Sequence, residues 1–112
     1  MISEAQIQIG RANFQQEVVE ADQPVLVDFF ANWCAPCRQI APVVRHLATQ
    51  YAGRLKVVAV DVDQNGFLVD RFDVQRLPCL ILFKGGRPIP LQTGYSPTML
   101  PAICERIELL LR

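Results

Sequence analysis

One six-residue segment constrains the fold of this chain more than any other. Residues 25–30 are β-branched, leucine and aromatic residues, and Asp28 is the only polar residue among them. Continuous apolar runs of this length are typical of strands that are covered on both faces, as in sheets packed between helices. The segment therefore predicts a strand at the centre of an α/β sheet, with the Asp28 carboxylate among hydrophobic side chains.

The rest of the chain alternates between strand-like and helix-like patterns. Apolar residues at three- and four-residue steps follow Cys34 and stop at Gly53, which predicts a long amphipathic helix with Pro42 inside it as a kink. Gly85-Gly86 predicts a hairpin turn, so the last two strands should be antiparallel. Further strands are predicted at 7–9, 56–62, 80–83 and 88–93, and further helices at 13–20, 65–72 and 97–111. Together these elements predict a mixed sheet flanked by helices.

Length and charge limit the kinds of protein this chain can be. Its 112 residues, 51% of them hydrophobic, predict one compact domain over residues 1–112 with a single core. Eleven basic and eleven acidic side chains cancel, so we expect no binding to nucleic acid or to a membrane surface. Residues 1–6 show no secretory pattern, and no apolar stretch reaches the roughly 18 residues of a membrane span. We therefore expect a cytoplasmic monomer in a reducing compartment.

Two cysteines stand where the central strand gives way to the long helix. Cys34 and Cys37 are three residues apart, a helical spacing of roughly 5 to 6 Å between Cβ atoms, and a small adjustment from this would allow a disulfide. The helix N-terminus favours an anion, so it should stabilise the thiolate of Cys34. We expect Cys34, at an exposed lip, to attack a substrate disulfide, and Cys37, one turn deeper, to resolve the mixed disulfide.

Zinc binding is the alternative interpretation of this cysteine pair. A structural zinc site needs two further ligands in a recognisable grouping. Cys79 and Cys104 are isolated from each other, and His46, the only histidine, should lie on the surface of the long helix. The spacing therefore favours redox chemistry, and we expect no metal and no cofactor.

Residues 27–37, VDFFANWCAPC, resemble the active-site segment of the thioredoxin family. Pro42 resembles that family's helix-kinking proline, Leu77-Pro78 its cis-proline loop, residues 83–86 its hairpin and residues 93–95 its glycine loop. The likeness covers essentially the whole chain, in order. It implies a five-stranded mixed sheet of order 1-3-2-4-5 with four flanking helices, and a protein-disulfide reductase that carries electrons from a thioredoxin reductase to disulfide-containing proteins.

The resemblance also implies roles for individual residues. It makes Asp28 the proton acceptor for Cys37, and burial should raise the pKa of this carboxyl group. A cis bond before Pro78 would present the backbone of Leu77 to an extended substrate, and Gly94 would allow close approach. Arg38, which directly follows the cysteine pair, either steers acidic substrates, lowers the pKa of a thiol, or is an ordinary solvated helix charge. The substrate-binding residues implied are Trp33, Ala35, Pro36, Leu77, Pro78 and Gly94.

Three positions depart from the family pattern. Ala35 replaces the commonest glycine of the motif, and Ala59 replaces a semi-buried lysine, so the pKa of Asp28 should rise further without that cation. Cys79 replaces the usual threonine after the cis-proline. It is either a small packing residue or a modulator, acting through a regulatory disulfide or a metal or iron-sulfur site with the catalytic pair. Cys104 is expected to be a buried small hydrophobe.

Two other functions compete with a disulfide reductase. A non-catalytic interaction module would use the same surface without the thiols, although it has no need of a complete cysteine pair. A disulfide oxidase or isomerase would use the same cysteines at a less reducing potential than the roughly −270 mV typical of thioredoxin. The sequence leaves open the potential, the physiological substrates and whether the electron donor is an NADPH- or a ferredoxin-linked reductase.

Overall fold

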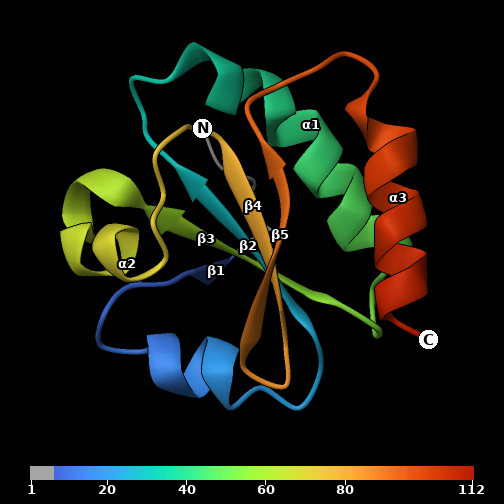
Figure 1. Ribbon diagram of the computed structural model, residues 1–112, viewed down its shortest axis with the longest axis horizontal. Helices are drawn as coiled ribbons and strands as arrows, with labels where there is room; N and C mark the ends of the chain where they lie inside the picture. The colour runs from blue at the N-terminus through green and yellow to red at the C-terminus, as the bar shows by residue number, and fades with distance from the viewer. Residues whose placement is uncertain (1–6) are drawn as a thin grey trace.

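The computed structural model describes residues 7–112, so the predicted lack of a secretory pattern at residues 1–6 lies outside the described part (Figure 1). Each predicted strand and helix is present with bounds that differ from expectation by at most three residues. The elements in chain order are β1 (Ile7–Gln8), η1 (Gln15–Val19), β2 (Val25–Phe30), α1 (Ala35–Gln50), β3 (Lys56–Asp61), η2 (Val62–Gln64), α2 (Gly66–Arg71), β4 (Cys79–Lys84), β5 (Arg87–Thr93) and α3 (Met99–Leu110).

The five strands form one mixed sheet of order β1-β3-β2-β4-β5, which confirms the expected topology. β2 runs parallel to β3 and antiparallel to β4, and all six of its residues are buried. β1 is parallel to β3, and β5 is antiparallel to β4. The continuous apolar run at residues 25–30 is therefore the central strand, as predicted.

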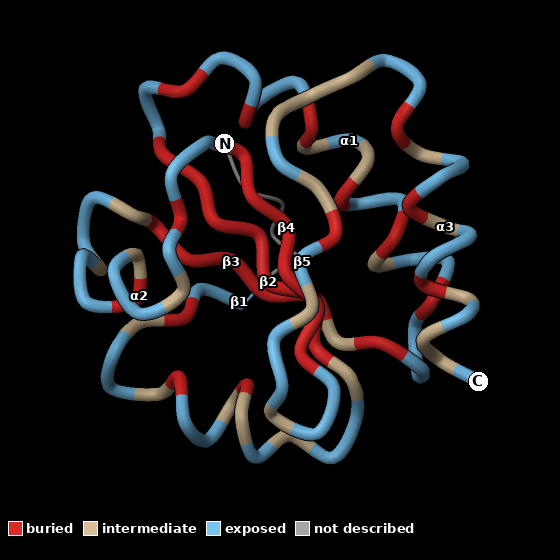
Figure 2. The backbone as a smooth tube through the Cα atoms, in the orientation of Figure 1, coloured by how far each residue is buried: buried red, intermediate tan, exposed pale blue. Residues whose placement is uncertain are grey.

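Helical elements cover both faces of the sheet. η1 and α2 pack on one face through Phe14, Val18 and Leu68, together with alternate strand residues such as Phe29. α1 and α3 pack on the other face, where Ile40 and Ile103 share a core with inward-facing leucines of the strands. Figure 2 shows the buried strands at the centre and exposed segments on the outer surfaces of the helices. The four flanking helices η1, α1, α2 and α3 thus agree with expectation.

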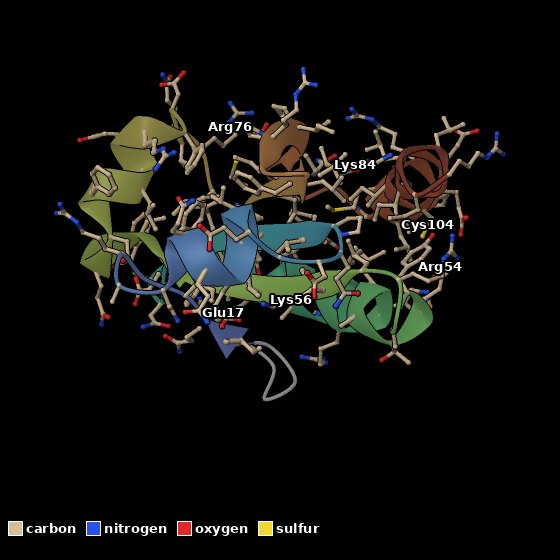
Figure 3. The ribbon with its side chains drawn as sticks, turned by 90° about the horizontal axis from the view of Figure 1, so that it is seen from below. Glu17, Arg54, Lys56, Arg76, Lys84 and Cys104 are labelled. Atoms are coloured by element: carbon tan, nitrogen blue, oxygen red, sulfur yellow. A yellow bond between two sulfur atoms is a disulfide. The ribbon has the colours of Figure 1, made fainter. Side chains whose placement is uncertain are left out.

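The helix predicted at 13–20 is shorter and wider than an ordinary α-helix. Residues Gln15–Val19 form a π-helical turn, in which the amide of Glu20 donates to the Gln15 carbonyl at 2.9 Å. The Lys56 ammonium group donates to the Glu17 carboxylate at 2.6 Å and to the Glu17 carbonyl at 2.9 Å (Figure 3). Both bonds attach this turn to the start of β3, a long-range constraint that local periodicity does not reveal.

α1 continues through Pro42 to Gln50, as the apolar stripe on both sides of the proline predicted. Neither this helix nor any other among residues 7–112 is long and apolar enough to cross a membrane.

The hairpin between β4 and β5 also forms as predicted. Gly85 and Gly86 have φ values of 61° and 80°, a left-handed conformation that glycine adopts without steric cost. β5 forms one edge of the sheet and contains Pro88 and Pro90, opposite Phe83 and Ile81 of β4. Proline has no amide hydrogen, so it is confined to edge strands or bulges, and the pairing of β4 with β5 shifts register between Leu80 and Ile81.

Candidate active site

Cys34 and Cys37 form a disulfide at the beginning of α1, with their Cα atoms 5.3 Å apart. Cys34 is the N-cap residue of this helix, and its sulfur accepts a hydrogen bond from the Cys37 amide at 3.2 Å. Pro36 lies in the first turn, where a missing amide hydrogen costs nothing. Once the pair is reduced, the same amide and the helix dipole are in place to stabilise a thiolate on Cys34, and that stabilisation stays a prediction.

The prediction that Cys34 stands at an exposed lip is wrong. Cys34 is 4% exposed and Cys37 is 7% exposed, so overall exposure does not distinguish the two cysteines. The physical reason is that Cys34 faces a groove, while the exposed residues Trp33, Ala35 and Pro36 surround it. Cys34 lines this groove and Cys37 does not, so Cys34 is the cysteine that can be reached from the groove.

The groove beside Cys34 has a volume of about 440 Å³ and is mainly apolar. Side chains from the α1 N-terminus, the start of η2, α2 and the segment before β4 meet there. Four of the predicted substrate-binding residues line it. The groove-lining residues are Trp33, Cys34, Ala35, Pro36, Val62, Val69, Val74, Gln75 and Leu77.

Trp33 is the most exposed large hydrophobic residue at this groove, with 69% of its surface accessible. Its indole Nε1 donates a hydrogen bond to Asp63 Oδ2 at 2.9 Å. Asp63 belongs to η2, which begins directly after β3 and is capped by Asp61, whose carboxylate accepts from the Asp63 amide at 3.0 Å. Asp63 thus holds the indole in one orientation over the rim.

The Leu77–Pro78 peptide bond is cis, which confirms the expectation from the family. Leu77 lines the groove, while Pro78 and Gly94 lie beside it and are joined by a 2.8 Å hydrogen bond from the Gly94 amide to the Pro78 carbonyl. Gly94 has a φ of 75°, a value that favours glycine. The two predicted docking loops are therefore attached to each other.

Asp28 is buried in β2, directly opposite Ala59 on β3 and Leu80 on β4. Ala59 is fully buried and packs in one cluster with Cys34 and Cys37. The alanine that replaces the family's lysine therefore neighbours Asp28, as predicted, and brings no positive charge to it.

Cys79 begins β4 and is 6% exposed. It packs in the core on the η1 and α2 face rather than in the cluster around Cys34 and Cys37. Burial, and secondarily the negative charge of Asp28, raise the pKa of the Cys79 thiol to about 11. A thiol that stays protonated at neutral pH is a poor nucleophile, which favours the packing role over the modulating role.

The metal option for Cys79 has no support in the geometry. Within residues 7–112, no group of three or more histidine, cysteine, aspartate or glutamate side chains is placed to hold a metal ion. His46 is exposed on α1, where it was expected.

Two other expectations change with the structure. Cys104 was expected to be buried, but it is half-buried, and its thiol donates to Gln50 Oε1 at 3.8 Å. Cys104 on α3 lies next to Gln50, the last residue of α1, and periodicity within α3 alone does not show this contact. The Arg38 guanidinium donates to the Asn32 carbonyl at 3.0 Å, so this side chain braces the loop before Cys34.

Sequence reasoning missed part of the site. Asp63 and the groove walls from Val62, Val69, Val74 and Gln75 received no role in advance. Asp63 had a usable signal, because an acidic residue just beyond β3 lies at the carboxyl edge of the strand parallel to β2, where sites in α/β sheets form. The valines had no such signal, since they resemble ordinary core residues.

A disulfide at a helix N-terminus, placed beside an apolar groove and backed by a buried carboxylate, defines a thiol-disulfide oxidoreductase. The family model for thioredoxin matches residues 5–104. Since that match spans most of the chain, the chain belongs to the thioredoxin family and is a protein-disulfide oxidoreductase.

Similar proteins agree with this assignment. Thioredoxin 1 of a Nostoc species is 44% identical over 83% of this chain and 87% of its own length. Thioredoxin of Alicyclobacillus acidocaldarius is 48% identical over 77% of this chain and 81% of its own. Thioredoxin of a Synechocystis species is 39% identical over 88% of this chain and 94% of its own.

Proposed function

We propose that residues 1–112 form a single-domain, monomeric, cytoplasmic reductase of protein disulfides that a thioredoxin reductase returns to the dithiol state. The observation that carries this proposal is the Cys34–Cys37 disulfide at the α1 N-terminus, with the Cys37 amide directed at the Cys34 sulfur beside the groove. Neither cofactor nor metal takes part. The near-balanced charge supports partners recognised by local shape and chemistry rather than by nucleic acid or membrane binding.

Reduction proceeds in two exchanges. The Cys34 thiolate attacks one sulfur of the substrate disulfide, forming a mixed disulfide, and the other substrate sulfur leaves as a thiolate and takes a proton. Cys37 then loses its proton to Asp28 and attacks the Cys34 sulfur, which forms the Cys34–Cys37 disulfide and releases the second substrate thiolate. Two electrons pass from the protein to the substrate.

Asp28 suits the role of proton acceptor because of where it lies. It is buried beside Ala59, which packs against the Cys37 cluster, and the site around it excludes most water. Bulk water has little access to such a setting, so a carboxylate there is the better proton acceptor for a thiol near it.

Substrate docking uses the groove and the two joined loops. Trp33, Ala35 and Pro36 contact the substrate on one side of Cys34, and Leu77 offers its backbone amide and carbonyl to an extended segment on the other. Pro78 holds the Leu77 loop against Gly94, whose missing side chain leaves room for that segment.

Insulin disulfide reduction with a dithiol reductant tests the activity. Wild-type protein should accelerate the reaction, and Cys34→Ser should abolish the acceleration, because the nucleophile is lost. Equal rates for the two proteins would overturn the proposal. A coupled assay with NADPH-linked or ferredoxin-linked reductase then identifies the electron donor.

A redox titration separates a reductase from an oxidase or isomerase. A reductase should have a potential near −270 mV, whereas the oxidising relatives lie well above it. A value above about −200 mV would assign the same cysteines to disulfide formation or isomerisation instead.

A further inference from the structure

Arg76 stands at the edge of the groove without taking part in the chemistry described so far. It lies between Gln75 and Leu77, both of which line the groove. Its side chain is directed toward the glycine loop, where Arg76 Cδ lies 3.6 Å from the position that a Cβ atom on Gly94 would occupy. Figure 3 shows this side chain extending outward from the body of the molecule. A substrate segment that crosses Gly94 therefore passes the Arg76 guanidinium.

The charge of Arg76 is not matched by any group among residues 7–112, where its guanidinium makes neither an ion pair nor a hydrogen bond. Some of the other arginines in the described part of the chain are engaged. Arg54 pairs with Glu108 at 3.4 Å, and Arg106 donates to the carbonyl groups of Pro90 and Leu91. An exposed, unmatched cation at the edge of a mainly apolar groove remains available to a bound partner.

A negative charge also lies near the groove, at Trp33. Asp63 is exposed there and accepts the Trp33 indole, while Arg76 lies on the Leu77 side. A substrate segment in this groove thus meets an anion near Trp33 and a cation near Gly94. Charges arranged in this way affect which ligands bind, and in which orientation, more than they raise the overall affinity.

We propose that Arg76 is a specificity-determining residue, which favours disulfide substrates with a carboxylate one or two residues from the reacting cysteine. This inference rests on the proposed reductase function. An extended segment beside Leu77 places alternate side chains toward Gly94, where a carboxylate pairs with Arg76. Exposed ion pairs of this kind change an equilibrium or a rate by about two- to fivefold.

Three disulfide-linked peptide homodimers test the inference, with Asp, Ser or Lys beside a single cysteine and otherwise identical sequences. The released thiol is measured by chromatography after mixing with reduced protein. Each rate constant is divided by that for dithiothreitol, an uncharged dithiol, because a neighbouring charge also alters the leaving thiol. The wild type should prefer the Asp peptide to the Lys peptide by about fivefold, and 0.5 M salt should reduce this ratio toward one.

Arg76→Gln should bring the Asp-to-Lys ratio close to one, and Arg76→Glu should invert it. Arg87→Glu is the matched control, because Arg87 is exposed and begins β5 at the hairpin end of the sheet, away from Cys79 and the groove. It changes the net charge equally and should keep the wild-type ratio. An unchanged ratio in Arg76→Glu, or an equal change in Arg87→Glu, would overturn the inference.

The Ser peptide distinguishes this failure from failure of the proposed function. If wild type reduces the Ser peptide and Cys34→Ser does not, the reductase function stands whatever the charge preference. If wild type leaves the Ser peptide oxidised, the reductase function and the inference built on it are both refuted.

Discussion

Asp28 and Ala59 face each other across the pairing of β2 with β3, both buried, beside the cluster that holds the cysteine pair. A carboxylate is therefore set against a methyl group at the point where a lysine is expected in this family. An adjacent cation favours the charged form of a carboxyl group, and Ala59 supplies no such cation.

Ala59→Lys should shift the acidic limb of the pH-rate profile for disulfide reduction to lower pH, by about one unit or more. The ammonium group favours ionised Asp28, so the carboxylate is available as a proton acceptor at lower pH. Insulin reduction measured from pH 5 to pH 9 checks this. Ala59→Met adds comparable bulk without charge and is the control. The same profile in both variants would contradict the prediction.

Asp28→Asn should slow the second exchange by about 10² or more, because the amide cannot take the proton of Cys37. The mixed disulfide between Cys34 and the substrate should then accumulate. Rapid acid quenching followed by mass spectrometry measures its amount during turnover. The first exchange does not use Asp28, so its rate should change little, and a slowed first exchange with no accumulated intermediate would refute the assigned role.

Cys79 should make the oxidised protein less stable in alkali. Its thiol has a pKa of about 11 when folded against an ordinary value of 9.0, so the folded state keeps a proton that the unfolded state releases between these values. Unfolding therefore becomes easier as pH rises from 9 to 11. At pH 10.5 the loss relative to pH 8 should be about 2 kcal/mol.

Urea unfolding of wild type and Cys79→Ala at pH 8 and pH 10.5 measures this contribution. At pH 8 wild type should have a larger free energy of unfolding than Cys79→Ala, because its side chain is buried. This difference between the two proteins should shrink by about 2 kcal/mol at pH 10.5. Tyr51, whose pKa burial raises to about 12, is present in both proteins and cancels in the comparison. A pH-independent difference between them would show that Cys79 titrates normally.

Asp63→Ala should weaken substrate binding without changing the chemical step. Loss of the 2.9 Å bond to the indole frees Trp33 to leave its orientation over the groove, at a cost of about 1 kcal/mol. The KM for insulin should rise about fivefold while kcat stays the same. Asp63→Asn keeps an acceptor oxygen and should lie close to wild type, and a fall in kcat in either variant would contradict a pure positioning role.

The sequence predicted the parts of this protein that depend on local pattern. The apolar run at residues 25–30 correctly indicated the central strand, and Gly85-Gly86 correctly indicated the hairpin. Strand order and the cis bond before Pro78 came from the family resemblance, because neither is encoded in periodicity.

The expectations that failed depend on contacts between segments far apart in the chain. Cys34 is enclosed because residues around it and from α2 form a groove, and a motif in one segment cannot show that. The π-helical turn at Gln15 is attached through Lys56, 39 residues from Glu17. Cys104 is half-buried and contacts Gln50 at the end of α1, a neighbour that the pattern of α3 alone does not show.

The prolines of β5 protect one edge of the sheet. A protein-disulfide oxidoreductase contacts other polypeptide chains, and an unpaired strand edge can pair with an extended segment of such a chain. β5 is an edge strand, and Pro88 and Pro90 carry no amide hydrogen, so this edge is a poor template for backbone pairing. The two residues that confine β5 to the edge therefore also disfavour the addition of a foreign strand there.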